Sequence, residues 1–275
     1  MVSFAASDGY RFYARRWEPV GRPRVRLVFL HGIRSHGGWY GRSCRRFAES
    51  GCEVHFLDRR GAGLNTACRG DTPSFRRLLD DVAEYLLHTR AETPWLPTVL
   101  GGISWGGKLA VGLPYRRPGL IDGLLLVAPG LKPQITPPLG DRLRILAASR
   151  LRPGRLFPIP LNEPELFTAD PDWQRFIDSD RFGLRQATAR FLFASVALDM
   201  YLRRAARRVT TPTLLLLAGH DRVIDNGKTR KFVARFPSRD NRVLDYPDAH
   251  HTLEFEPDGH PWVGDVLNWV GKRFG

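Results

Sequence analysis

Residues 98–108 read Thr-Val-Leu-Gly-Gly-Ile-Ser-Trp-Gly-Gly-Lys. The apolar run from Thr98 to Ile103 predicts a buried strand, and Trp105 to Leu113 has the composition of a helix. Between them, residues 102–106 match the pattern G-x-S-x-G. In such a setting a tight strand-to-helix turn lifts the serine oxygen above the sheet, and the small flanking residues avoid clashes. This stretch therefore predicts an α/β fold and makes Ser104 the candidate nucleophile.

Apolar runs bounded by glycine or proline alternate with amphipathic segments on both sides of this turn, a pattern typical of a mostly parallel sheet flanked by helices. We expect strands over 24–30, 53–57, 98–103, 124–128, 212–217 and 242–246. We expect helices over 39–50, 74–90, 105–113, 227–236 and 261–274. Between about 132 and 208 only helices are expected, over 139–150, 163–178 and 187–208. Residues 1–130 and 209–275 are therefore predicted to form the α/β core, and residues 131–208 a helical cap insertion.

A backbone site for negative charge is expected beside Ser104. The strand over 24–30 ends at His31-Gly32-Ile33. At that place the N–H of Ile33 can join the N–H of Trp105, at the start of a helix, as an oxyanion hole. The His31 side chain is interpreted as a structural loop residue.

A serine nucleophile needs a base and a carboxylate that orients the base. Asp221 follows the apolar run 214–218 and is the candidate acid, whereas Asp225 is expected to cap the next helix. His250 and His251 follow the last strand, and on position alone either of them could be the base. The order Ser, Asp, His agrees with an α/β-hydrolase topology.

These motifs resemble the α/β-hydrolase superfamily, and within it the monoacylglycerol lipase and lysophospholipase group with its serine aminopeptidase S33-like members. The similarity spans nearly the whole chain. It is carried by the following segments: 31–32, 35–40, 58–63, 102–106, 219–221, and 251–253 with Glu256. In that group the base histidine is followed by leucine two positions later and glutamate five later. His251 fits this spacing and His250 does not, so the resemblance selects His251.

The resemblance also implies that the insertion covers an acyl-binding pocket. Substrate contacts are then expected at Trp39, Tyr40, Phe191 and Met200. The chain departs from the group where glycine and glutamate are common after the His-Gly pair. Arg34 and Ser35 stand there instead.

The function expected on this basis is hydrolysis of a small acyl ester, with no metal and no organic cofactor. A dehalogenase or an epoxide hydrolase would need a carboxylate at position 104. A prolyl-type aminopeptidase remains an alternative, because Glu163 and Glu165 could bind a substrate ammonium group. A non-catalytic ligand-binding protein on the same fold is a second alternative.

The charge and the cysteine content of the chain limit the kinds of partner that are expected. The chain has 42 Lys and Arg residues against 28 Asp and Glu residues, a formal charge of +14, and 37 of the 42 are arginine. These residues are scattered without interleaved aromatic residues, so no nucleic acid is expected, although the charge permits weak attraction to anionic lipid surfaces. The three cysteines show no metal-binding spacing and are expected to be reduced. Since no signal peptide is visible, the expected location is cytoplasmic.

Overall fold

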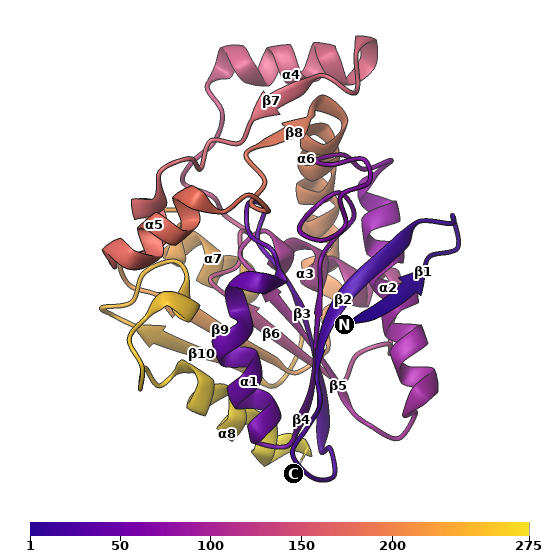
Figure 1. The fold of residues 1–275 in the computed structure, drawn as a ribbon, viewed down its shortest axis with the longest axis vertical. Helices are drawn as coiled ribbons and strands as arrows, with labels where there is room; N and C mark the ends of the chain where they lie inside the picture. The colour runs from indigo at the N-terminus through magenta and orange to yellow at the C-terminus, as the bar shows by residue number, and fades with distance from the viewer. Residues whose placement is uncertain (275) are drawn as a thin grey trace.

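The computed structural model describes residues 1–274 and contains one eight-stranded sheet (Figure 1). The strands are β1 (Val2–Ala5), β2 (Arg11–Trp17), β3 (Val25–Leu30), β4 (Cys52–Leu57), β5 (Thr98–Ile103), β6 (Gly123–Val127), β9 (Thr213–Ala218) and β10 (Asn241–Tyr246). Their order is β1-β2-β4-β3-β5-β6-β9-β10. The pairs β1–β2 and β2–β4 are antiparallel, and every other pair is parallel. Every residue of β3, β4, β5, β6 and β9 is buried, as expected for parallel strands covered on both faces.

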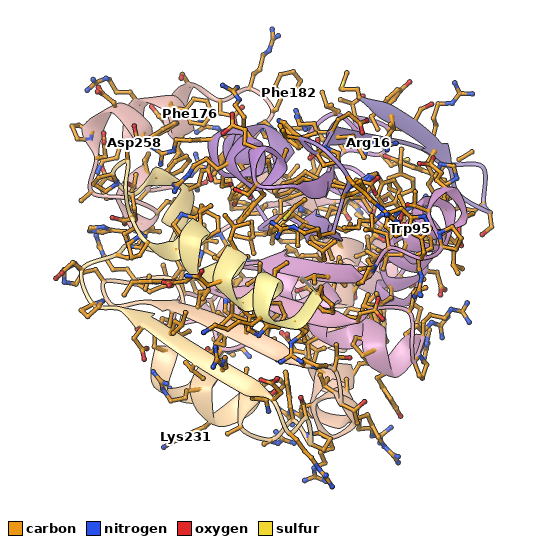
Figure 2. The ribbon with its side chains drawn as sticks, turned by 90° about the horizontal axis from the view of Figure 1, so that it is seen from below. Arg16, Trp95, Phe176, Phe182, Lys231 and Asp258 are labelled. Atoms are coloured by element: carbon orange, nitrogen blue, oxygen red, sulfur yellow. The ribbon has the colours of Figure 1, made fainter. Side chains whose placement is uncertain are left out.

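Helices cover both faces of this sheet. They are α1 (Gly41–Glu49), α2 (Phe75–Glu92), α3 (Gly106–Arg116), α7 (Asn226–Val233) and α8 (Trp262–Phe274). Figure 2 shows α1 and α8 on one side of the strands and Lys231 of α7 on the other. The rings of Phe47 in α1 and Trp262 in α8 pack edge to face, which joins the two helices on one face of the sheet. The architecture is the mostly parallel, helix-flanked sheet that the sequence predicts.

The segment between β6 and β9 leaves the sheet and forms the upper part of the molecule in Figure 1. It contains α4 (Leu139–Leu151), β7 (Leu156–Pro158), the 3-10 turn η2 (Pro164–Leu166), α5 (Pro171–Ser179), β8 (Gln186–Thr188), α6 (Ala189–Ala205) and the 3-10 turn η3 (Ala206–Arg208). α6 packs against α3, the helix that follows Ser104. Leu161 and Phe167 of this segment line the same cavity as Ser104, so the segment also borders the predicted nucleophile.

Two sequence expectations were wrong in this region and near the N-terminus. β7 and β8 pair as a small antiparallel sheet where only helices were expected. Each has three residues, too few for an alternating pattern to be seen. β1 and β2 form one antiparallel edge of the main sheet, where no strand was expected.

The helix expected over 39–50 is divided. A 3-10 turn, η1 (Gly37–Tyr40), precedes α1. The His36 ring accepts a hydrogen bond from the Gly38 N–H and so caps η1. Helical composition cannot by itself distinguish a 3-10 turn from the first turn of an α-helix.

The cysteine expectation agrees with the structure, in which Cys44, Cys52 and Cys68 are all unpaired and only Cys68 is exposed. Within residues 1–274, no helix is both long and apolar enough to cross a membrane.

Side chains of β3 and β4 form a buried charged cluster. Arg26 Nε lies 2.5 Å from Glu53 Oε1, and His55 Nε2 lies 3.1 Å from the same oxygen. Arg26 is 0% exposed and Glu53 is 3% exposed. Burial alone would raise the pKa of Glu53, but hydrogen bonds from His55 and Arg26 outweigh it and lower this pKa to about 2. The ionised carboxylate therefore stabilises the fold above pH 4.5, and this contribution is lost as the pH falls through about 2.

Glu53→Gln is expected to destabilise the protein by about 3–5 kcal/mol, because it leaves the buried Arg26 charge without its carboxylate. Urea unfolding at neutral pH measures the difference. Glu49→Gln, at an exposed position of α1, is the matched control and should change stability by less than about 0.5 kcal/mol. Equal stability of the two variants would contradict this account of the cluster.

Candidate active site

Ser104 sits on a strained turn between β5 and α3. Its φ is +50°, a left-handed conformation that costs a non-glycine residue about 1–3 kcal/mol. The turn is possible because two glycines remove side chains from it. A Cβ at Gly106 would lie 2.3 Å from the Leu30 carbonyl oxygen, and one at Gly102 would lie 2.6 Å from Gly107 Cα. The Ser104 N–H donates to the Val127 oxygen at 3.0 Å, which ties the turn to the end of β6.

Ser104, His251 and Asp221 form a hydrogen-bonded chain. His251 Nε2 lies 2.9 Å from Ser104 Oγ, and His251 Nδ1 lies 2.7 Å from Asp221 Oδ2. Asp221 Oδ1 accepts from the N–H groups of Val223 and Ile224 at 2.8 and 2.9 Å. Because these two bonds fix the carboxylate, Asp221 holds the His251 ring with its Nδ1–H directed at Asp221 Oδ2 and its Nε2 free to accept the Ser104 proton.

The competing residues have other partners. Asp225 caps α7 by accepting from the Lys228 N–H at 2.8 Å, as the sequence predicts. Glu256 Oε1 accepts from the His250 N–H at 2.6 Å and lies 3.2 Å from His250 Nδ1. Glu256 thus holds the backbone next to His251, a role that sequence reasoning missed because it matched Glu256 only as a spacing marker.

Glycines also leave room around the predicted oxyanion hole. Ile33 lines the same cavity as Ser104. A Cβ at Gly32 would lie 3.5 Å from Ser104 Oγ, and one at Gly130 would lie 3.1 Å from the Trp105 nitrogen. A substrate carbonyl oxygen can therefore approach from this side, where the N–H groups of Ile33 and Trp105 remain the predicted donors.

The His31 side chain belongs to the frame of this loop. Its Nδ1 lies 2.7 Å from the Gly32 oxygen, and its Nε2 accepts from the Arg59 N–H at 3.0 Å. Burial, assisted by the nearby Arg59 charge, lowers the pKa of His31 to about 3, so the ring is neutral. These contacts agree with the structural role expected for His31.

Arg59 was not predicted as a site residue, yet it supports both sides of the oxyanion loop. Its Nη1 donates to the Gly32 oxygen at 3.0 Å and its Nη2 to the Ile33 oxygen at 2.7 Å. The guanidinium lies 5.2 Å from the ring centroids of both Trp105 and Phe191. Burial lowers the pKa of Arg59 to about 9. Arg59 belongs to the motif at residues 58–63. Its contacts, however, are with three segments distant in the sequence, and a motif does not reveal those.

The cavity beside Ser104 has a volume of about 10 Å³, which is room for one water molecule. Its lining residues are Gly32, Ile33, Arg34, Ser35, Trp39, Tyr40, Ile103, Ser104, Leu161, Phe167, His251 and Thr252. Trp39 and Tyr40 are therefore placed where substrate contacts were expected. Phe191 instead packs on Trp105, with ring centroids 5.3 Å apart. Met200 is 55% exposed on α6 and does not line this cavity, so its substrate contact stays a prediction.

Polar contacts close the segment between β6 and β9 over this cavity. Asp180 accepts from Trp39 Nε1 at 2.7 Å and lies 3.1 Å from His36 Nε2. The Thr252 N–H, next to His251, donates to the Phe167 oxygen at 3.0 Å. Burial would raise the pKa of Asp180, but the hydrogen bonds from His36 and Trp39 lower it to about 2. In this structure the cavity beneath these contacts has room for about one water molecule.

Within residues 1–274, no three His, Cys, Asp or Glu side chains are arranged to hold a metal ion. The site contains a hydroxyl, an imidazole and a carboxylate hydrogen-bonded in series. Such an arrangement can perform acyl transfer.

A family model described as "Serine aminopeptidase, S33" matches residues 21–258. A monoacylglycerol lipase of Mycolicibacterium smegmatis is 26% identical over 271 residues, which are 98% of this chain and 95% of that protein. The human monoglyceride lipase is 27% identical over 280 residues, covering 97% of this chain and 89% of the relative.

Two solved structures share the fold. The monoacylglycerol lipase of Paleococcus ferrophilus superposes with a TM-score of 0.85 at 21% identity, covering 95% of this chain and 99% of that one. A soluble variant of the Saccharomyces cerevisiae monoglyceride lipase superposes with a TM-score of 0.87 at 18% identity, covering 98% and 94%. These superpositions confirm the predicted α/β-hydrolase fold.

Proposed function

This chain belongs to the serine aminopeptidase S33 family, and on that premise we propose that it hydrolyses carboxylic esters through an acyl-enzyme on Ser104. One observation carries the proposal. His251 Nε2 lies 2.9 Å from Ser104 Oγ, and its Nδ1 lies 2.7 Å from a carboxylate that two N–H groups hold in place. This is the connection that turns a serine hydroxyl into a nucleophile.

In the proposed reaction, Ser104 Oγ attacks the ester carbonyl carbon while His251 Nε2 takes the hydroxyl proton. The N–H groups of Ile33 and Trp105 stabilise the negative oxygen of the tetrahedral intermediate. When the intermediate collapses, His251 returns the proton to the leaving alcohol and the acyl group remains on Ser104. Water then attacks the acyl-enzyme by the same route and releases the carboxylic acid.

The substrate class follows from the relatives, which are monoacylglycerol and monoglyceride lipases of similar length. The proposed substrates are small monoacylglycerol- or lysophospholipid-like esters. We divide the chain into a catalytic core, residues 1–130 and 209–275, and a cap, residues 131–208, that must open to admit them. The net charge of +14 would favour weak attraction to anionic lipid surfaces.

The contacts do not favour the aminopeptidase alternative. Glu163 and Glu165 are both exposed, and neither lines the cavity beside Ser104. The charged residue that does line it is Arg34, which would repel a substrate ammonium group.

A substrate panel tests the proposal. The purified protein is expected to hydrolyse p-nitrophenyl acyl esters and a short monoacylglycerol, to be labelled by a fluorophosphonate, and to leave proline p-nitroanilide intact. Faster turnover of the anilide would establish the aminopeptidase reading. No labelling and no turnover of any substrate would establish a non-catalytic protein.

Asp221→Asn is expected to lower kcat about 10⁴-fold, because an amide no longer stabilises the His251 imidazolium and favours the wrong ring tautomer. The measurement is ester hydrolysis at saturating substrate. Asp225→Asn is the matched control four residues away. It keeps a helix cap and should retain nearly full activity. A similar loss in both variants would indicate damage to the loop instead of loss of an orienting carboxylate.

A further inference from the structure

Arg34 brings a guanidinium to the cavity of Ser104. The residue is 2% exposed and directly follows Ile33, the predicted oxyanion donor. Its Nη1 donates to the Leu161 oxygen at 2.6 Å. Its Nη2 is also buried and has no hydrogen-bond acceptor among residues 1–274. One arm of the guanidinium is therefore engaged, and the other keeps its hydrogen-bonding capacity.

The charge of Arg34 has no carboxylate partner in the described part of the chain. Asp178 and Asp180 are close enough to favour the charged form, but Asp180 is engaged by Trp39 and His36. Burial and the neighbouring Arg185 lower the pKa of Arg34. Burying a charge without a counter-charge costs free energy, so its presence at the site calls for a compensating ligand.

Two further features place this charge within reach of a substrate. The guanidinium carbon lies 5.9 Å from the Phe167 ring centroid, and that ring lies 5.9 Å from the His251 ring. Phe167, Arg34 and Ser104 all line the same cavity. Arg59, the second buried guanidinium here, donates from its Nη groups to the carbonyls of the oxyanion loop. Its Nε is also buried without an acceptor, but Arg59 does not line this cavity. Arg34 is thus the guanidinium that both lines the cavity and keeps a donor for a ligand.

We propose that Arg34 makes this enzyme selective for esters that carry a second, anionic group, a carboxylate or a phosphate, a few atoms from the scissile carbonyl. The proposal rests on the ester hydrolysis proposed above and adds the substrate's charge. An oxygen of that anion accepts from Nη2, and the ion pair offsets the cost of burying the guanidinium. Arg34 is then a specificity-determining residue that takes no part in proton transfer.

Two matched substrate pairs test the proposal and locate the anion. The first pair is p-nitrophenyl butyrate and mono-p-nitrophenyl glutarate, which adds a carboxylate on the acyl side. The second is 1-octanoylglycerol and its 3-phosphate, which adds a phosphate on the alcohol side. We expect the wild type to have a higher kcat/KM for the anionic member of one pair. Arg34→Met should lower that preference about 10- to 100-fold, the size of a charge-assisted hydrogen bond, and Arg34→Lys should keep part of it.

Arg185→Met is the matched control. Arg185 is a neighbouring arginine whose side chain is 47% exposed, and its loss should leave the anionic-to-neutral ratio unchanged. Fluorophosphonate labelling reports whether each variant keeps an intact Ser104. If Arg34→Met does not fold, inhibition of the wild-type protein still tests whether the site binds an anion. Glutarate or glycerol 3-phosphate should then inhibit hydrolysis of a neutral ester competitively, at concentrations where glycerol does not.

Several results would overturn the proposal while leaving ester hydrolysis intact. One is a wild type that turns over the neutral members but prefers neither anionic one. Another is an Arg34→Met variant that slows both members of a pair equally, since Arg34 would then only tie the loop to Leu161. Failure of the wild type to hydrolyse any of the four esters would instead reject the proposed function itself.

Discussion

Ser104→Ala is expected to lower kcat for ester hydrolysis about a millionfold, to the residual rate that the oxyanion hole and substrate binding provide. The variant removes the oxygen that His251 activates at 2.9 Å, and with it the acyl-enzyme. Alanine fits the same backbone with one atom fewer, so the fold should be retained. Initial rates of ester hydrolysis at saturating substrate measure kcat. Fluorophosphonate labelling should disappear together with the activity.

Ser195→Ala is the matched control for this substitution. The Ser195 hydroxyl accepts from Trp105 Nε1 at 2.9 Å. Ser195 therefore contacts the side chain of the residue whose backbone N–H is a proposed oxyanion donor. Its loss should cost at most about tenfold in kcat, because neither the nucleophile nor a backbone N–H is changed. More than 1% of wild-type activity in Ser104→Ala would mean that another group is the nucleophile.

His251→Ala is the second large prediction, with an expected loss in kcat close to that of Ser104→Ala. Serine and histidine act as a unit, so removing either one abolishes the same step. The double variant should therefore be scarcely slower than either single variant. Additive losses would contradict a shared step.

His250→Ala provides the control, since it deletes the same side chain one residue earlier. The Glu256 contact to the His250 N–H remains available in this variant because it involves the backbone. We expect less than a tenfold change in kcat. If His250→Ala were the inactive variant and His251→Ala the active one, the proposed base would be wrong.

Much of the fold could be predicted because its signals are local. β5 and β6 are continuous apolar runs next to glycine or proline, and the structure places them within one residue of the predicted ranges. β7 and β8 have three residues each and are strands only because they pair with each other, so no local sequence pattern predicts them. The first turn of the helix expected over 39–50 became η1 through a cap from His36, which a composition pattern does not register.

Some features of the candidate site could likewise be predicted from local sequence, and others could not. The G-x-S-x-G pattern is sufficient to predict the turn at Ser104, because the clashes that Gly102 and Gly106 avoid arise mostly within the turn and the strand beside it. Position after a strand was also enough to favour Asp221 over Asp225. The sequence could not show that Met200 lies exposed on α6, because helical spacing fixes which residues share a face but not which way that face points.

The sequence by itself thus determined the parallel sheet, the turn at residue 104 and the residue types of the candidate triad, all of which follow from backbone sterics and short-range spacing. Only the tertiary structure decided which groups meet. It joined His251 to Ser104 across 147 positions and turned His250 toward Glu256. It also buried Arg34 beneath Leu161, 127 positions away, with one donor unused. Burial and charge compensation depend on the packing of distant segments. For that reason the sequence marked Arg34 only as a departure from the family pattern, and the structure was needed to show that its guanidinium is buried at the cavity beside Ser104.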